Sequence, residues 1–139
     1  PESIKPTFED FDVFGDEKAE KAIVTYGRTF SACAFAYEKL LKAGESVKLI
    51  KLNRIIPVCE GAVEAAKTCK DVYFFEEGIR RGGAGEGFLF DLSKAGFGGK
   101  YHLRAIENGF VKQASVESLL HEYGFDEEGV LSFIASAED

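Results

Sequence analysis

A glycine-rich segment holds the residues whose types and spacing are best suited to chemistry. The stretch FFEEGIRRGGAGEG runs from Phe74 to Gly87 and continues a short apolar run. A glycine-rich loop between a buried strand and a helix often binds phosphate, because backbone N–H groups and the positive end of the helix face the ligand. The candidate residues are two glutamates, two arginines and three glycines: Glu76, Glu77, Arg80, Arg81, Gly82, Gly83 and Gly85.

The spacing within this segment argues against a phosphate loop. The dinucleotide-binding pattern G-x-G-x-x-G/A fails, because the sixth position counted from Gly83 is Phe88. The nucleotide-hydrolase loop needs Gly-Lys-Ser/Thr, which the sequence lacks. Glu76 and Glu77 would repel a phosphate. We therefore predict that the glycines let a helix start close to the sheet or to another subunit. The glutamates would then bond the helix-start amides or a neighbouring chain.

The remaining polar residues identify no catalytic or metal site. His102 and His121 are the only histidines and have no partner at metal-ligand spacing, so we interpret both as surface residues. Lys48, Lys51 and Arg54 form a modest basic cluster, which we interpret as a solvated face rather than an anion site. No Ser/His/Asp or Cys/His set can be assembled from the spacing. The residues alone therefore predict a domain without a catalytic, cofactor-binding or metal site.

The composition limits the class of protein. A chain of 139 residues, 45% of them apolar, is long enough for one domain with a sizeable core. A formal charge of −7 argues against nucleic acid or an anionic membrane as the main partner. The apolar runs are too short to span a bilayer. The three cysteines form no CxxC pair, which argues against a disulfide framework or a zinc site and favours the cytoplasm.

The hydrophobic pattern alternates between strands and helices. We expect residues 1–12 to be a linker or extended lead-in and residues 13–139 to form one domain. Strand–helix alternation implies right-handed crossovers and a mostly parallel sheet, so the predicted fold is a three-layer α/β/α sandwich. The predicted strands are 11–15, 22–27, 46–52, 72–75 and 101–106. The predicted helices run from about 30 to 44, from after Pro57 to about 69, from the glycine segment to about 95, and over two short segments that begin near Ser115 and Asp126.

The apolar residues of these elements predict the core. The uninterrupted run from Val72 to Phe75 is typical of a central strand that is covered on both faces. Residues 101–106 alternate, which predicts a strand near the sheet edge. The stripe of the last helix contains Val130, Phe133, Ile134 and Ala137. The stripe of the first helix is predicted to contain Phe30, Cys33, Ala34, Tyr37, Leu40 and Leu41.

Three long stretches resemble the C-terminal domain of the transketolase superfamily. KAIVTYGRTFSACAFAYEKLLKAGESVKLIKLNRIIPV is similar to its opening strand, helix and second strand. VYFFEEGIRRGGAGEGFLFDL is similar to its apolar strand and glycine-rich helix start, and FVKQASVESLLHEYGFDEEGVLSFI to its ending. The match covers roughly residues 20–135. Within the superfamily, the stretches KLNRI, FFEEG and YGFDEEGV most resemble the 1-deoxy-D-xylulose 5-phosphate synthases.

The resemblance implies a fold and a biological context. The fold is a five-stranded mixed sheet whose first strand is antiparallel, in the last third of a longer, homodimeric enzyme. In that family, thiamine diphosphate and magnesium bind between two upstream domains, and the C-terminal domain supports the fold and the dimer. This chain alone would hold no cofactor and be inactive. The alternatives are a transketolase, a 2-oxoacid dehydrogenase β-chain, or a stand-alone module that binds a small anion through Arg80, Arg81 and the helix start.

Overall fold

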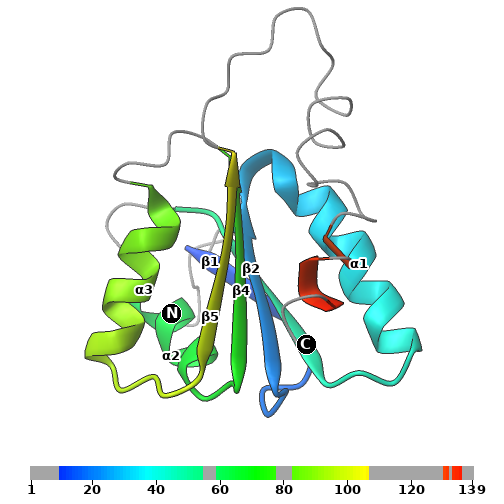
Figure 1. Ribbon diagram of the computed structural model, residues 1–139, viewed down its shortest axis with the longest axis horizontal. Coiled ribbons are helices and arrows are strands. Elements are labelled where there is room, and N and C mark those ends of the chain that lie inside the picture. Colours follow the sequence, from blue (N-terminus) through cyan, green and yellow to red (C-terminus); the bar gives the residue numbers. More distant parts are fainter. Residues whose placement is uncertain (1–9, 55–58, 78–82, 107–129, 132, 136–139) are drawn as a thin grey trace, which may run out of the picture.

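A central sheet lies between two layers of helices (Figure 1). The computed structural model describes residues 10–54, 59–77, 83–106, 130–131 and 133–135. The elements are β1 (Phe11–Phe14), β2 (Lys21–Tyr26), the 3-10 turn η1 (Gly27–Thr29), α1 (Phe30–Lys42), β3 (Val47–Leu52), α2 (Glu60–Lys67), β4 (Asp71–Glu77), α3 (Ala84–Lys94) and β5 (Lys100–Ile106). Residues 130–131 and 133–135 are also helical.

The sheet has five strands in the order β1-β3-β2-β4-β5. β1 pairs antiparallel with β3, whereas the pairs β3–β2, β2–β4 and β4–β5 are parallel. This topology confirms the predicted mixed sheet with one antiparallel strand and the three-layer α/β/α fold. The strand at 101–106 was predicted near the sheet edge, and β5 does lie at the end of the described sheet.

Each face of the sheet carries its own apolar core. One core joins alternate residues of β2, β3 and β4 to α2 and α3. The other joins the intervening residues to α1 and to the C-terminal helical residues. All four side chains from Val72 to Phe75 in β4 are fully buried, because successive residues of a strand point to opposite faces and both faces are covered. The prediction of a central, doubly covered strand is therefore confirmed.

The helical stripes agree with prediction except at one residue of α1. Cys33 and Tyr37 are buried as predicted, but Leu41 is 44% exposed. The stripe is centred on Cys33, Ala36 and Leu40, so Leu41 is rotated past its edge. In the C-terminal helical residues, Val130 and Ile134 are buried and Phe133 packs against the same core.

The predicted residues between 107 and 129, including Ser115, His121 and Asp126, lie outside the described part of the chain, as does Ala137.

The order in which the chain adds strands to the sheet reverses between the parallel strands β2 and β4. After β2 the chain crosses through α1, on one face, to β3, whereas after β4 it crosses through α3, on the opposite face, to β5. The helices that follow these two neighbouring strands, α1 and α3, therefore lie on opposite faces of the sheet (Figure 1). In open α/β sheets this topological switch point is the preferred place for a ligand site.

Candidate functional site

The glycine-rich segment begins at the switch point, at the carboxyl end of β4. Glu76 is the next-to-last residue of β4, and Gly83 precedes the first turn of α3 in an extended conformation. These two residues bring the end of the strand and the beginning of the helix together. The amino end of α3 carries a partial positive charge, so the group that lies there decides whether an anion could bind.

The carboxylate of Glu76 occupies the start of α3. The side chain is buried, and the Gly85 N–H donates a hydrogen bond to its Oε1 at 2.8 Å. Burial raises the pKa of the Glu76 carboxyl, and the charge of Glu86 raises it further, while hydrogen bonds from the backbone amides of Gly85 and Ala84 oppose the rise. The position that a bound anion would take at this helix start is thus filled by a side chain of the protein.

Gly85 allows α3 to lie close to the sheet. A Cβ atom at this position would come within 2.4 Å of Leu103 Cδ1 and 3.2 Å of Phe74 Cδ1. Leu103 belongs to β5 and Phe74 to β4, so a side chain here would displace the Leu103 side chain or move the helix away from these two strands. The close approach also brings the Gly85 amide within reach of Glu76.

Tyr101 extends this contact to the edge strand. Its hydroxyl donates a hydrogen bond to the carbonyl oxygen of Gly85 at 2.6 Å. Burial raises the pKa of the Tyr101 hydroxyl, and the negative charge of Glu76 raises it further, so the group stays a neutral donor. Tyr101 could not be identified from the sequence, because its pairing depends on the distance between β5 and α3 rather than on any local spacing.

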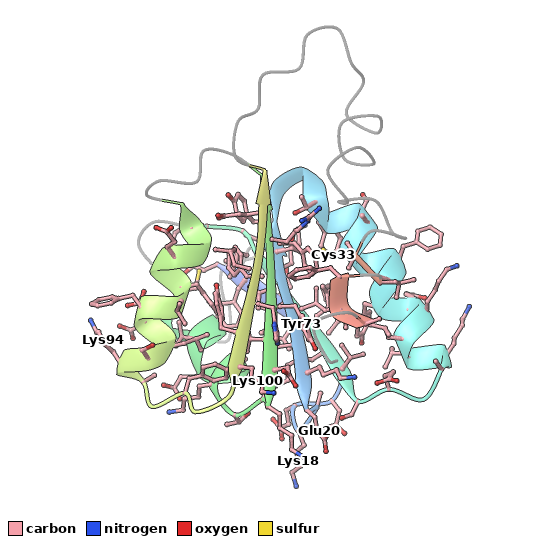
Figure 2. The ribbon with its side chains drawn as sticks, in the orientation of Figure 1. Lys18, Glu20, Cys33, Tyr73, Lys94 and Lys100 are labelled. Atoms are coloured by element: carbon pink, nitrogen blue, oxygen red, sulfur yellow. The ribbon has the colours of Figure 1, made fainter. Side chains whose placement is uncertain are left out.

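A buried threonine cluster connects the carboxyl ends of β2 and β4. Thr25 and Thr29 bond each other through their hydroxyl groups, and the Thr25 hydroxyl also donates to the Phe75 carbonyl at 3.1 Å. The side chain of Cys33, next to Thr25, lies between α1 and the sheet (Figure 2). Burial raises the pKa of the Cys33 thiol to about 12, although a hydrogen bond with Thr25 opposes the rise. A thiol held protonated in this way is a poor nucleophile, which agrees with its interpretation as a core residue.

The structure brings part of the predicted set together. Glu76, Gly83 and Gly85 meet at the beginning of α3, while the backbone of Glu77 ends β4. The side chain of Glu77 and the whole of Arg80, Arg81 and Gly82 lie outside the described residues. The interface role proposed for these residues therefore stays a prediction.

The interpretation of His102 as a surface residue was wrong. Its Nε2 lies 3.0 Å from Asp71 Oδ1, its side chain is 15% exposed, and its ring stacks on Tyr73 at a centroid distance of 4.6 Å. The register of β4 and β5 places His102 directly beside Tyr73, on a face that is largely covered. An alternating pattern indicates that one face of a strand is more exposed to solvent than the other. It does not tell which neighbouring element covers the less exposed face.

The interpretation of Lys48 as part of a solvated face was also wrong. The residue is only 1% exposed, and its Nζ donates hydrogen bonds to the carbonyl oxygens of Glu17 at 2.9 Å and Ala65 at 2.7 Å. β3 is an internal strand, so its alternate residues face α2 rather than solvent. The other two basic residues lie nearer the surface: Lys51 over the Phe30 ring, and Arg54 paired with Asp10 at 2.9 Å.

The described residues show neither a metal-binding group nor a membrane span. Within that part of the chain, no three His, Cys, Asp or Glu side chains are grouped where they could hold an ion. No described helix is both long enough and apolar enough to cross a bilayer. The arrangement at the switch point is thus a network of internal hydrogen bonds that fixes α3 on β4 and β5.

Comparison with known proteins defines the class to which this fold belongs. The family model for the transketolase C-terminal domain matches residues 15–130, so the chain belongs to that family. A solved split gene transketolase, described as an inactive β4 tetramer, superposes with a TM-score of 0.77 at 20% identity, covering 99% of this chain and 46% of the other. A 2-oxoglutarate:ferredoxin oxidoreductase from Magnetococcus marinus superposes over 95% of this chain with a TM-score of 0.65.

Two curated relatives carry the same enzyme name. The chain is 28% identical over 121 residues to the 1-deoxy-D-xylulose-5-phosphate synthase of Shouchella clausii, covering 86% of this chain and 19% of that enzyme. It is 32% identical over 124 residues to the synthase of Bacillus mycoides, covering 85% of this chain and 19% of that enzyme. The chain therefore spans about a fifth of the length of the curated relatives that it matches.

Proposed function

We propose that this chain is the C-terminal domain of a thiamine diphosphate-dependent 1-deoxy-D-xylulose 5-phosphate synthase. The observation that carries the proposal is its similarity, over 85–86% of its length, to curated synthases of that name. The parent enzyme would join a two-carbon unit from pyruvate to glyceraldehyde 3-phosphate, giving 1-deoxy-D-xylulose 5-phosphate and carbon dioxide. The product would feed isoprenoid, thiamine and pyridoxal synthesis in the cytoplasm.

We assign this domain a supporting rather than a catalytic role. Glu76 already occupies the start of α3, the described residues offer no metal-binding group, and the Cys33 thiol is held protonated. These residues do not fit a diphosphate with its magnesium ion, so we propose that upstream domains of the parent enzyme hold the cofactor. The domain would then complete the fold and the homodimer of that parent.

The substrates of the full-length parent protein test this proposal. With thiamine diphosphate and magnesium, the purified parent should release carbon dioxide from pyruvate in the presence of glyceraldehyde 3-phosphate and form 1-deoxy-D-xylulose 5-phosphate. Light scattering should give the mass of a dimer. Turnover of ketose and aldose phosphates without pyruvate would instead identify a transketolase. Oxidative decarboxylation coupled to a lipoyl acceptor would identify a 2-oxoacid dehydrogenase.

The transketolase alternative has a specific structural observation in its favour. The split gene transketolase superposes on 99% of this chain, and it is described as an inactive tetramer of β subunits. If the chain came from such a protein, activity would require a second, separately encoded subunit. Assay of the parent alone and after mixing with the product of the neighbouring reading frame separates the two arrangements.

The small-anion module is disfavoured at the helix start. A ligand there would compete with the Glu76 carboxylate for the Gly85 amide. Arg80 and Arg81 are the remaining candidates, so replacing both with alanine tests this alternative directly. A phosphate-containing ligand that binds the natural chain and is lost in the double variant would support the module.

A further inference from the structure

A second site of interest lies at the opposite, amino end of the sheet. A pocket of about 700 Å³ opens between the turn that joins β1 to β2 and the outer side of α2. Its lining includes Val13, Glu17, Lys18, Lys48, Ala65 and Thr68. Lys18, labelled in Figure 2, marks this turn at the lower end of the sheet. Neither the family resemblance nor the proposed function assigns a role to this pocket.

Lys48 joins the two walls of the pocket. Its Nζ donates to the Glu17 carbonyl on the turn and to the Ala65 carbonyl on α2. The residue is 1% exposed, and within the described part of the chain it forms no ion pair with a carboxylate. An ammonium group has three N–H donors, so two carbonyl acceptors leave one donor for another partner.

Among the described residues, carbonyl dipoles rather than a carboxylate compensate the charge of Lys48. The Ala65 carbonyl belongs to the last turns of α2, whose negative end attracts a cation. A buried cation without a carboxylate partner is nevertheless costly, because neutral carbonyl groups replace only part of its hydration. An anion in the adjoining pocket would supply the missing countercharge and accept the third N–H.

We propose that this pocket binds a small organic carboxylate, with the carboxylate on Lys48 and an apolar body against Val13 and Ala65. The rim favours a single negative charge, because the exposed Glu17 and Glu64 side chains would repel a doubly charged ion such as phosphate. Glu64 is already paired with Lys67 at 2.9 Å, so its repulsion is reduced rather than abolished. The inference does not depend on the identity of the parent enzyme.

The side-chain ammonium signal of Lys48 is the most direct readout. The chain of 15.3 kDa would be labelled with ¹⁵N and titrated with sodium butyrate at constant ionic strength. The Lys48 Nζ signal, assigned by its loss in Lys48→Met, should shift saturably. The signal of Lys94, which lies over the Phe90 ring on α3, serves as the control and should not move. A Lys48 signal unmoved by butyrate, or moved equally by sodium chloride, would overturn the proposal.

A matched pair of variants tests the pocket without removing Lys48. Val13 is 37% exposed on the edge strand β1, so Val13→Glu and Val13→Gln should both fold. Val13→Glu places a carboxylate at the pocket and should weaken butyrate binding about tenfold relative to Val13→Gln, as expected for repulsion close to one charge-assisted hydrogen bond. Equal affinities of the two variants would contradict the proposal, and tighter binding of inorganic phosphate than of butyrate would contradict the carboxylate class.

Discussion

At the scale of single residues, the beginning of α3 is held by a carboxylate rather than by a ligand. Glu76 comes from a strand, is buried, and accepts the Gly85 amide. Its spacing in the sequence indicates only that two glutamates follow an apolar run. The sequence therefore suggested a helix-start role without identifying which glutamate turns inward, since that choice depends on the alternation of β4 between two covered faces.

The raised pKa of Glu76 predicts a dependence of stability on pH. The folded chain holds the proton of the Glu76 carboxyl more tightly than the unfolded chain does. The contribution of this proton to the free energy of unfolding is therefore full below the unfolded pKa of about 4.3 and is lost as the pH rises through the folded pKa. Glu76→Gln has no carboxyl group to ionise at this position. Its free energy of unfolding should therefore increase relative to that of the natural chain as the pH rises from 4. Urea unfolding across that range measures the difference.

The exposed Glu38 on α1 provides the control for this measurement. Glu38→Gln removes one carboxylate from an exposed position and so controls for the change in net charge. A Glu76→Gln profile parallel to that of the natural chain at every pH would contradict the effect attributed to the buried carboxylate.

Replacing two glycines of α3 with larger residues should change the stability of the chain in opposite directions. Gly85→Val places atoms where Leu103 already lies, and overpacking of this kind typically costs about 1–3 kcal/mol. Gly87, in the same helix, has nothing within 4 Å of its Cβ position, so Gly87→Ala should stabilise the chain by up to about 1 kcal/mol through helix propensity. Chemical denaturation of both variants tests the pair. Equal effects would show that close packing at Gly85 is unimportant.

At the scale of elements, side chains from the sheet stabilise helix ends of both signs. Lys48 of β3 donates to a carbonyl near the end of α2, and Glu76 of β4 accepts an amide at the start of α3. Each charge is complementary to the helix end that it meets. The sequence predicted all of these strands and helices from their periodicity, but not these contacts. They depend on strand order, and the position of β3 between β1 and β2 cannot be read from the pattern of β3 itself.

The central strand should be the most sensitive element to truncation. Phe74 is fully buried and contacts the rings of Phe88 and Tyr101, so Phe74→Ala should cost about 3–5 kcal/mol. Phe90 on α3 is 61% exposed, and Phe90→Ala should cost far less. The shift in the urea midpoint of each variant measures the difference. A Phe74→Ala midpoint equal to that of Phe90→Ala would contradict the burial of β4.

At the scale of the whole molecule, the described residues form a three-layer α/β/α fold, and the chain belongs to the transketolase C-terminal family. The resemblance between sequences led to the fold and to the family, because order and spacing over most of the chain are specific even when each motif is weak. It did not reveal the burial of Lys48 or His102, which are set by cross-strand neighbours in this particular chain.

The isolated chain should not bind thiamine diphosphate. The helix start that could receive a diphosphate is occupied by Glu76, and the described residues offer no group for magnesium. Calorimetric titration with thiamine diphosphate and magnesium should therefore give no binding heat, and no synthase activity should be detected. Saturable binding at low-micromolar concentration would contradict the supporting role proposed for this domain.

The position of β4 between β2 and β5 also determines which amide protons exchange only on unfolding of the domain. Amide protons of β2 and β4 are surrounded by paired strands and by helices on both faces, so they can exchange with solvent only when most of the domain unfolds. β1 is four residues long and pairs with β3 alone among the described strands, so its amides can exchange through local fraying. Hydrogen–deuterium exchange should consequently divide one continuous sheet into a slow centre and a fast β1 margin.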